Sequence, residues 1–315
     1  MTSTDGPRPA PSSRPAGRVR WHLHGLNTGT IFTLTRVGVT HLPRAVSYGI
    51  GRVGTWLAFH LMTRATAALI GNLRVVFPAL PERELRRLAR RTYRSYAIEV
   101  IDFIRSVSTD RRELASWLSP ASTFPSARPT GGGFILLTGH LGNIELGAVL
   151  IRIVLNRPMA VVLVPEPDPH VNEQRRRMRD SLGIETVEVG QAVDTALRIR
   201  RLLSENRTVA VSADRPFGRD RVDVEFFGRR TAFLRTPALM GCLSGAPLVP
   251  AFMLRQPDGS YLGVALEPIH VPRDGDREAN VQTAIQAFAT ALEGVVRQHP
   301  HLWYHFYPYW GSDDS

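Results

Sequence analysis

The feature that most constrains the fold is a regular alternation of short apolar runs with helical stretches. Apolar runs occur at residues 134–138, 160–164, 208–212, 248–254 and 261–266, and helical patterns fill 143–155, 170–182, 191–204 and 236–244. This alternation predicts one α/β domain with a mostly parallel central sheet and helices on both faces. A turn at 256–259 predicts antiparallel last strands, so the sheet is expected to be mixed. A further helix is expected near 279–297.

The domain is expected to span residues 29–310, between a disordered Pro- and Arg-rich tail at 1–28 and a flexible C-terminus at 311–315. Within it, residues 29–70 combine apolar bulk with spaced arginines and a tryptophan, which suits helices lying in a membrane interface. An ordinary amphipathic helix packed on the domain is the alternative. Pro81 and the acidic residues after it predict a helix that runs to about Ser106. No apolar run approaches the ~20 residues needed to span a bilayer, and no secretory signal is seen.

The charge of the chain is strongly basic and carried without lysine. The formal net charge is +11, all of it from arginine, and Cys242 is the single cysteine. One cysteine excludes an internal disulfide and a Cys-rich zinc site. Permanently charged, planar guanidinium groups suit phosphate and carboxylate partners. Charge alone leaves nucleic acid, anionic lipid and acidic carrier proteins open as partners.

The strongest candidate for chemistry is the hexapeptide from His140 to Glu145, which lies between two apolar runs. That layout predicts a strand, a sharp turn and a helix, with the histidine at the sheet rim where open α/β sheets bind ligands. A neutral imidazole there can take a proton from an alcohol or amine that attacks an acyl carbonyl. Glu145 falls in the first helical turn, where the helix dipole alone would favour an acid. Asp214 follows another apolar run and is expected at the same rim.

The hexapeptide also resembles the His-X4-Glu/Asp signature of the lipid A late acyltransferase family, which includes bacterial phosphatidylinositol mannoside acyltransferases. Further segments resemble that family in the same order along the chain: the Asn-Leu…Phe-Pro stretch at 72–78, the Asp loop at 214–216, the Val-x-Phe-Phe-Gly stretch at 222–228, the Ser-Gly-Ala…Pro stretch at 243–250 and the aromatic tail at 303–310. The resemblance covers residues 30–310.

The resemblance implies a transferase that moves a fatty acyl group from acyl-CoA or acyl-carrier protein to a hydroxyl or amine of a lipid or glycolipid. His140 would be the general base, and Glu145 would support the histidine or help to bind the acceptor. Glu145 could then pair with His140, with an arginine or with the acceptor head. The substrate-binding residues expected around them are Asn143, Arg176, Arg179, Asp214, Arg215 and Glu225.

Some of these assignments leave alternatives open. In the basic cluster 175–179 we favour Arg179 and then Arg176, and expect a solvated helix face for the others. Glu225 could pair with the imidazole or could be an exposed strand residue. No Gly-x-Ser-x-Gly elbow, Walker loop or His-Glu-x-x-His is present, so we expect direct acyl transfer without a metal or cofactor.

The expected location is the cytoplasmic face of the cell membrane, with peripheral attachment to an anionic surface. The N-terminal helices and the aromatic tail would dip into the interface. The expected partners are the thioester donor and the lipid acceptor, and not nucleic acid. Two competing hypotheses are a non-catalytic basic protein that binds membranes or nucleic acid, and a thioester hydrolase on the same scaffold.

Overall fold

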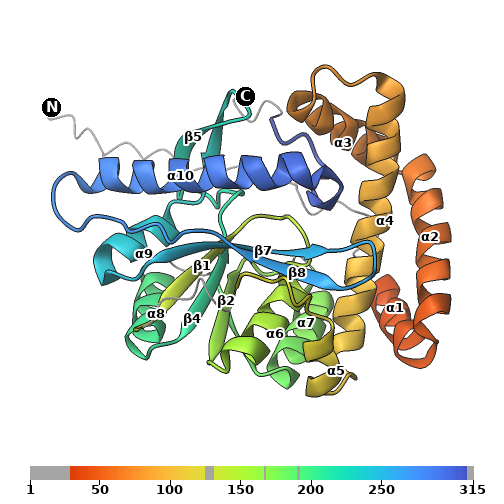
Figure 1. The fold of residues 1–315 in the computed structure, drawn as a ribbon, viewed down its shortest axis with the longest axis horizontal. Helices are drawn as coiled ribbons and strands as arrows, with labels where there is room; N and C mark the ends of the chain where they lie inside the picture. Colours follow the sequence, from red (N-terminus) through yellow and green to blue (C-terminus); the bar gives the residue numbers. More distant parts are fainter. Residues whose placement is uncertain (1–28, 125–130, 167, 190–191, 311–315) are drawn as a thin grey trace, which may run out of the picture.

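A computed structural model describes residues 29–124, 131–166, 168–189 and 192–310, and the expected terminal tails lie outside these ranges. Its centre is a six-stranded sheet with the order β3-β2-β4-β1-β7-β8 (Figure 1). The strands are β1 (Phe134–Thr138), β2 (Met159–Leu163), β3 (Ile184–Glu188), β4 (Thr208–Ser212), β7 (Leu248–Arg255) and β8 (Tyr261–Ala265). Only β8 is antiparallel to its neighbour. The predicted mixed, mostly parallel sheet is confirmed.

Helices cover both faces of this sheet. Their bounds are α5 (Arg111–Ser116), α6 (Ile144–Leu155), α7 (Pro169–Ser181), α8 (Ala192–Ser204), α9 (Thr236–Ser244) and α10 (Arg277–Gln298). Alternate residues of β1 point to opposite faces. Ile135 and Leu137 join a core with α8, α9 and α10. Phe134 and Leu136 join a second core with α5 and α6.

Three short strands were not predicted from the sequence. Strand β3 has no continuous apolar run, because Ile184–Glu188 alternates apolar and polar residues and lies at the edge of the sheet. The segment 222–233 forms a separate hairpin of β5 (Val222–Phe226) and β6 (Arg229–Phe233). This hairpin packs on α10, so it stands outside the main sheet (Figure 1).

The N-terminal part forms three helices packed against a long fourth. These are α1 (Gly29–His41), α2 (Arg44–Leu61), α3 (Thr63–Val76) and α4 (Glu82–Ser106), and α4 ends where the sequence predicted. Figure 1 shows α4 crossing the end of the domain, with α1 and α2 on its outer side and α3 beside its upper end. No described helix is both long enough and apolar enough to cross a membrane.

The aromatic C-terminal segment follows a short 3₁₀ turn, η1 (Pro300–Leu302), and lies inside the protein. Trp303 and His305 are fully buried, and Tyr304 and Phe306 are nearly so. The side-chain amide nitrogen of buried Asn72 binds the segment. It donates to the carbonyls of His305 and Tyr307 at 3.0 and 2.8 Å. The expectation that this tail dips into a membrane is therefore wrong, because its rings fill the core beside α4.

Candidate active site

His140 meets Asp214 because β1 and β4 are parallel neighbours. Thr138 is paired with Ser212 in the register, and each site residue lies two positions beyond its strand. The carboxyl ends of parallel strands share one edge, so the two side chains meet there. His140 Nδ1 lies 2.7 Å from Asp214 Oδ1, and the His140 backbone N–H donates to Oδ2 at 2.8 Å.

The turn after His140 is fixed by a glycine and a helix cap. Gly142 has a φ of +69°, and a Cβ there would lie 2.1 Å from the Met253 carbonyl oxygen, so only glycine fits. Asn143 then caps α6, since its Oδ1 accepts from the Leu146 N–H at 3.1 Å. The Asn143 amide donates to the Glu99 carbonyl at 2.9 Å. Although it lines the cavity described below, the Asn143 side chain is thus used to hold the turn.

The protonation of the pair follows from its surroundings. Burial would raise the pKa of Asp214, but His140 and His305 hold it well below its usual value. Burial and then Arg215 lower the pKa of His140, against the opposing effect of Asp214. The imidazole is therefore neutral at pH 7 beside an ionised carboxylate. Because a carboxylate can only accept, Nδ1 carries the proton and Nε2 is free to act as a base.

The aromatic segment holds Asp214 from the other side. His305 Nε2 donates to Asp214 Oδ2 at 3.0 Å, and the Tyr309 hydroxyl donates to the Asp214 carbonyl at 2.7 Å. Tyr307 donates to His305 Nδ1 at 3.1 Å. Burial and then Arg215 lower the pKa of His305 to about 3, so it stays neutral. No local pattern indicated these roles, apart from the place of the residues in the aromatic tail.

Asp214 was expected to contact substrate, and its geometry revises that expectation. The carboxylate is fully buried, with a side-chain exposure of 0%, whereas the His140 side chain is 25% exposed. Its oxygens are occupied by the two histidines and a backbone N–H. Asp214 therefore holds the His140 imidazole in place. The signal available in the sequence was the equal spacing of His140 and Asp214 from the ends of two apolar runs.

Glu145 pairs with arginine and not with His140. Arg179 Nε and Nη2 donate to its two carboxylate oxygens at 2.9 and 2.5 Å. Arg175 lies 3.8 Å from Glu145 and 3.0 Å from Glu166. Burial would raise the pKa of Glu145, but Arg179 and then Arg175 reverse this and lower it. Glu145 is thus an ionised partner of two arginines, five residues from a neutral imidazole.

His140 and the Glu145–Arg179 pair open into one cavity of about 320 Å³. Its polar wall includes Glu145, Glu166, Arg175 and Arg179. Its apolar walls come from the ends of β2 and β4, the loop after β4, the turn after β6 and the helix α4. They include Val161, Val162, Leu163, Val211, Phe217, Leu234, Val100 and Phe103. The volume is in the range of small-ligand pockets, and the mixture of walls suits an amphipathic ligand.

The other expected site residues lie in different places. Arg215 lines the cavity and donates to the Tyr304 carbonyl at 2.8 Å. Arg175 lines it as well, which corrects the expectation that it is solvated. Arg176 lies on the outer face of α7, where it pairs with Glu173 and Asp180.

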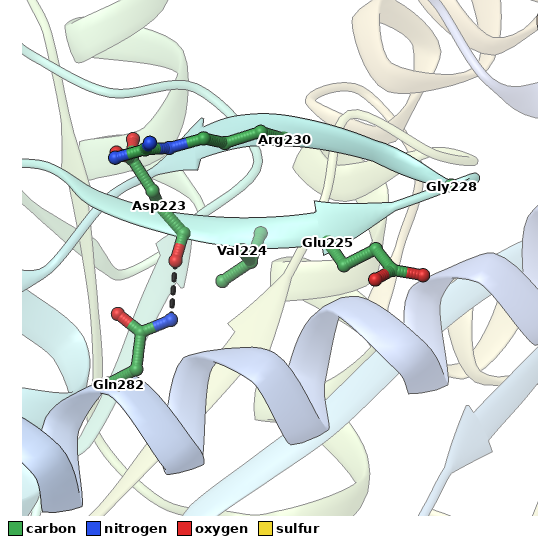
Figure 2. Close-up of a pocket in the computed structure, with 6 residues that line it drawn as sticks. All are labelled: Asp223, Val224, Glu225, Gly228, Arg230 and Gln282. Carbon is green, nitrogen blue, oxygen red and sulfur yellow. Dashed lines mark hydrogen bonds and ion pairs between the residues drawn. The ribbon is translucent and has the colours of Figure 1, made fainter.

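Glu225 is on the β5–β6 hairpin and is exposed. It lines a surface hollow with Asp223, Gly228, Arg230 and Gln282, where Gln282 donates to the Asp223 carbonyl (Figure 2). It is not among the described residues around His140, and Asp214 occupies the imidazole position proposed for it. Over the described ranges, no group of three His, Cys, Asp or Glu side chains is placed to hold a metal ion.

Comparison with known proteins places this arrangement in a family. The sequence is 28% identical to a phosphatidylinositol mannoside acyltransferase of Mycolicibacterium smegmatis over 60% of each chain. A Mycobacterium tuberculosis protein of the same name is 26% identical over 65% of this chain and 63% of its own. The chain thus spans less than two thirds of these relatives. A lipid A biosynthesis lauroyltransferase of Escherichia coli is 24% identical over 91% of both chains. The family model described as bacterial lipid A biosynthesis acyltransferase matches residues 21–312, so the chain belongs to that family.

Proposed function

We propose that this protein transfers a fatty acyl group from an acyl thioester to a hydroxyl or amine of a lipid or glycolipid, with His140 as general base. The observation that carries the proposal is a neutral imidazole, fixed at Nδ1 by a buried carboxylate, that lines a cavity with apolar and charged walls. A histidine held in this tautomer is suited to accept a proton at Nε2.

The proposed reaction is a direct transfer. Nε2 takes the proton of the acceptor hydroxyl or amine while its oxygen or nitrogen attacks the thioester carbonyl carbon. The tetrahedral intermediate then collapses, the C–S bond breaks, and the thiolate leaves. The imidazolium returns the proton to the thiolate, so the products are an ester or amide and a free thiol. Asp214 stabilises the imidazolium in between, since the ion pair forms inside the protein.

The two kinds of cavity wall have different proposed tasks. The apolar ends of β2 and β4 would receive the acyl chain, which is bound by burial of its methylene groups. Arg175, Arg179 and Arg215 would attract the phosphates of acyl-CoA or of a carrier-protein arm, or an anionic head group. The names of the relatives support phosphatidylinositol mannoside-like or lipid A-like acceptors, and no cofactor beyond the thioester is needed.

The test is release of free thiol by purified protein with acyl-CoA or acyl-carrier protein and candidate glycolipid acceptors. The variant His140→Ala should lose at least about 10²-fold in rate, the low end for a general base. His270→Ala is the matched control, because His270 is exposed and lies outside the cavity. Activity that survives in His140→Ala would contradict the proposal. Thiol release without any acceptor would identify a hydrolase instead.

We also propose that the protein binds the cytoplasmic face of an anionic membrane through α2. An exposed apolar stripe follows one side of this helix: Val46, Ile50, Val53, Trp56, Leu57 and Leu61, with exposures between 44% and 76%. Arg52 of α2 lies near Arg91 and Arg94 of α4, since burial and then the charges of Arg52, Arg255 and Arg91 lower the pKa of Arg94. An apolar stripe beside clustered arginines suits an anionic interface.

Sedimentation with vesicles tests this surface. Replacing both Ile50 and Trp56 with Ser should weaken binding to vesicles that contain anionic lipid by at least about tenfold, because two apolar side chains are no longer buried in the interface. The control Leu197→Ser removes an exposed apolar residue on α8. Equal binding of all three proteins would exclude α2 as the docking surface.

A further inference from the structure

A second acid, Glu99 of α4, lies at the wall of the His140 cavity and has no part in the chemistry described so far. The residue is only 4% exposed. Its side chain faces the hydroxyl of Tyr304, another buried residue that lines the cavity. Burying a polar group without full hydrogen bonding is destabilising, so this arrangement calls for an explanation.

The pair has hydrogen-bonding capacity that the protein does not use. Within the described residues, both Glu99 carboxyl oxygens and the Tyr304 hydroxyl lack a well-formed hydrogen bond. Burial raises the pKa of Glu99 well above its usual value, and burial followed by Glu99 raises that of Tyr304. Burial thus favours the neutral, protonated form of both groups. Of their two O–H groups, one can bond the other residue, which leaves one donor for a ligand.

The next acid on the same helix provides a contrast. Asp102, one turn further along α4, is also buried, but its carboxylate binds Arg44 at 3.1 Å, the Tyr48 hydroxyl at 2.5 Å and the Tyr261 hydroxyl at 2.7 Å. Asp102 is thus a structural acid with a full set of partners. Glu99 lines the cavity without such a set.

Tyr304 is joined to His140 through the backbone, and both residues line the cavity. Leu141 and Trp303 form an antiparallel bridge, and the Tyr304 N–H donates to the His140 carbonyl at 2.9 Å. His140 and Tyr304 are therefore opposite each other in this short ladder. The Glu99–Tyr304 pair and His140 therefore line the same cavity from adjoining segments.

We propose that Glu99 and Tyr304 form an oxyanion-binding pair, which donates a hydrogen bond to the acyl carbonyl oxygen as that oxygen becomes negative in the tetrahedral transition state. The inference rests on the proposed acyl transfer. A neutral carboxylic acid paired with a tyrosine is suited to this task, because it donates without bringing a negative charge to the oxyanion. No proton changes place at this pair, so the proton balance at His140 is unaltered.

The test compares kcat and KM of the wild type with Glu99→Leu, Glu99→Gln and Tyr304→Phe. Glu99→Leu removes one oxyanion donor and should lower kcat by about 10²–10³-fold. The KM values for the acyl donor and for the acceptor should stay within about threefold of those of the wild type. Glu99→Gln keeps a neutral donor and should recover at least about tenfold of that loss. Tyr304→Phe keeps the ring but not the hydroxyl, and should lose about tenfold in kcat.

Glu84→Leu is the control, because it makes the same change on α4 outside the cavity. The proposal is overturned if Glu99→Leu keeps its kcat, or if its whole loss lies in KM, which would mean that the pair recognises a polar group of the bound substrate. An inactive wild type would instead refute the acyl-transfer function.

Infrared difference spectroscopy gives a second test, which does not depend on folding of the Leu variant. At neutral pH the wild type should show the carbonyl stretch of a protonated carboxyl group that is missing in Glu99→Gln. Carboxylate bands in its place would overturn the proposal.

Discussion

The two ends of the His140–Glu145 hexapeptide differ in electrostatic character although five positions separate them. His140 is neutral and is held by one carboxylate from β4 and by the buried aromatic segment. Glu145 is ionised and is held by Arg179 and Arg175 of α7. The difference shows that a single motif can supply a neutral imidazole and a charged carboxylate when its two side chains reach different elements of the fold.

The comparison predicts the largest effect at the His140 end. In Asp214→Asn the amide can donate to Nδ1, which would leave the proton on Nε2 and block the base. We expect kcat to fall by about 10²–10⁴-fold, by analogy with the loss that follows the wrong tautomer in serine proteases. Steady-state rates of thiol release give the measurement. If Glu145→Gln costs as much kcat as Asp214→Asn, the two ends do not have the distinct roles described here.

The pH dependence of stability should separate the two ends. The folded-state pKa of His305 is about 3, against 6.5 in the unfolded chain, so lowering the pH protonates the unfolded state first. The contribution of neutral His305 to the free energy of unfolding is complete above about pH 6.5. It should fall by about 3 kcal/mol between pH 7 and pH 4. Glu145, with its pKa lowered, loses its contribution only as the pH falls below about 4.5.

Urea unfolding of the wild type and of His305→Gln at several pH values checks this order. His305→Gln should show a much smaller change in the free energy of unfolding between pH 6.5 and pH 4, whereas Glu145→Gln should show the same change as the wild type. An identical pH slope in wild type and His305→Gln would show that the buried histidine does not control it.

The smallest expected effect is the coupling between Glu145 and Arg179. A double-mutant cycle with Glu145→Gln and Arg179→Gln should give a coupling free energy of about 1–3 kcal/mol in unfolding, because Arg179 is 4% exposed and bidentate. The exposed Glu173–Arg176 pair on the same helix is the control and should give less than about 1 kcal/mol. Equal couplings would remove the distinction between a cavity pair and a surface pair.

Much of the fold could be predicted because its signals are local. The apolar runs at β1, β2, β4, β7 and β8 and the helix after Pro81 are marked by composition and by turn residues. The edge strand β3 was missed because half of its residues are polar. The hairpin β5–β6 was missed because its apolar residues pack against α10 and not within the main sheet.

The site could be predicted only in part. The sequence indicated His140, Glu145, Arg179, Arg215 and the position of Asp214 at the rim. Arg176 was favoured over Arg175, although Arg175 is the one that lines the cavity. The two are consecutive in an unbroken basic run, so only the orientation of the helix distinguishes them. The aromatic tail looked like a membrane anchor, because hydrophobic rings have the same composition in an interface and in a core.

By itself the sequence determined the α/β class, the turn at Gly142 and the place of His140 at its start, because these depend on residues close together in the chain. Only the tertiary structure decided the partners. Asp214 meets His140 through strand register, and Arg179 meets Glu145 through the packing of α7. Residues from segments far apart in the chain lie near the same edge of the sheet: Asn72, Glu99, Tyr304 and His305. Such contacts depend on how the elements pack, which no local pattern records.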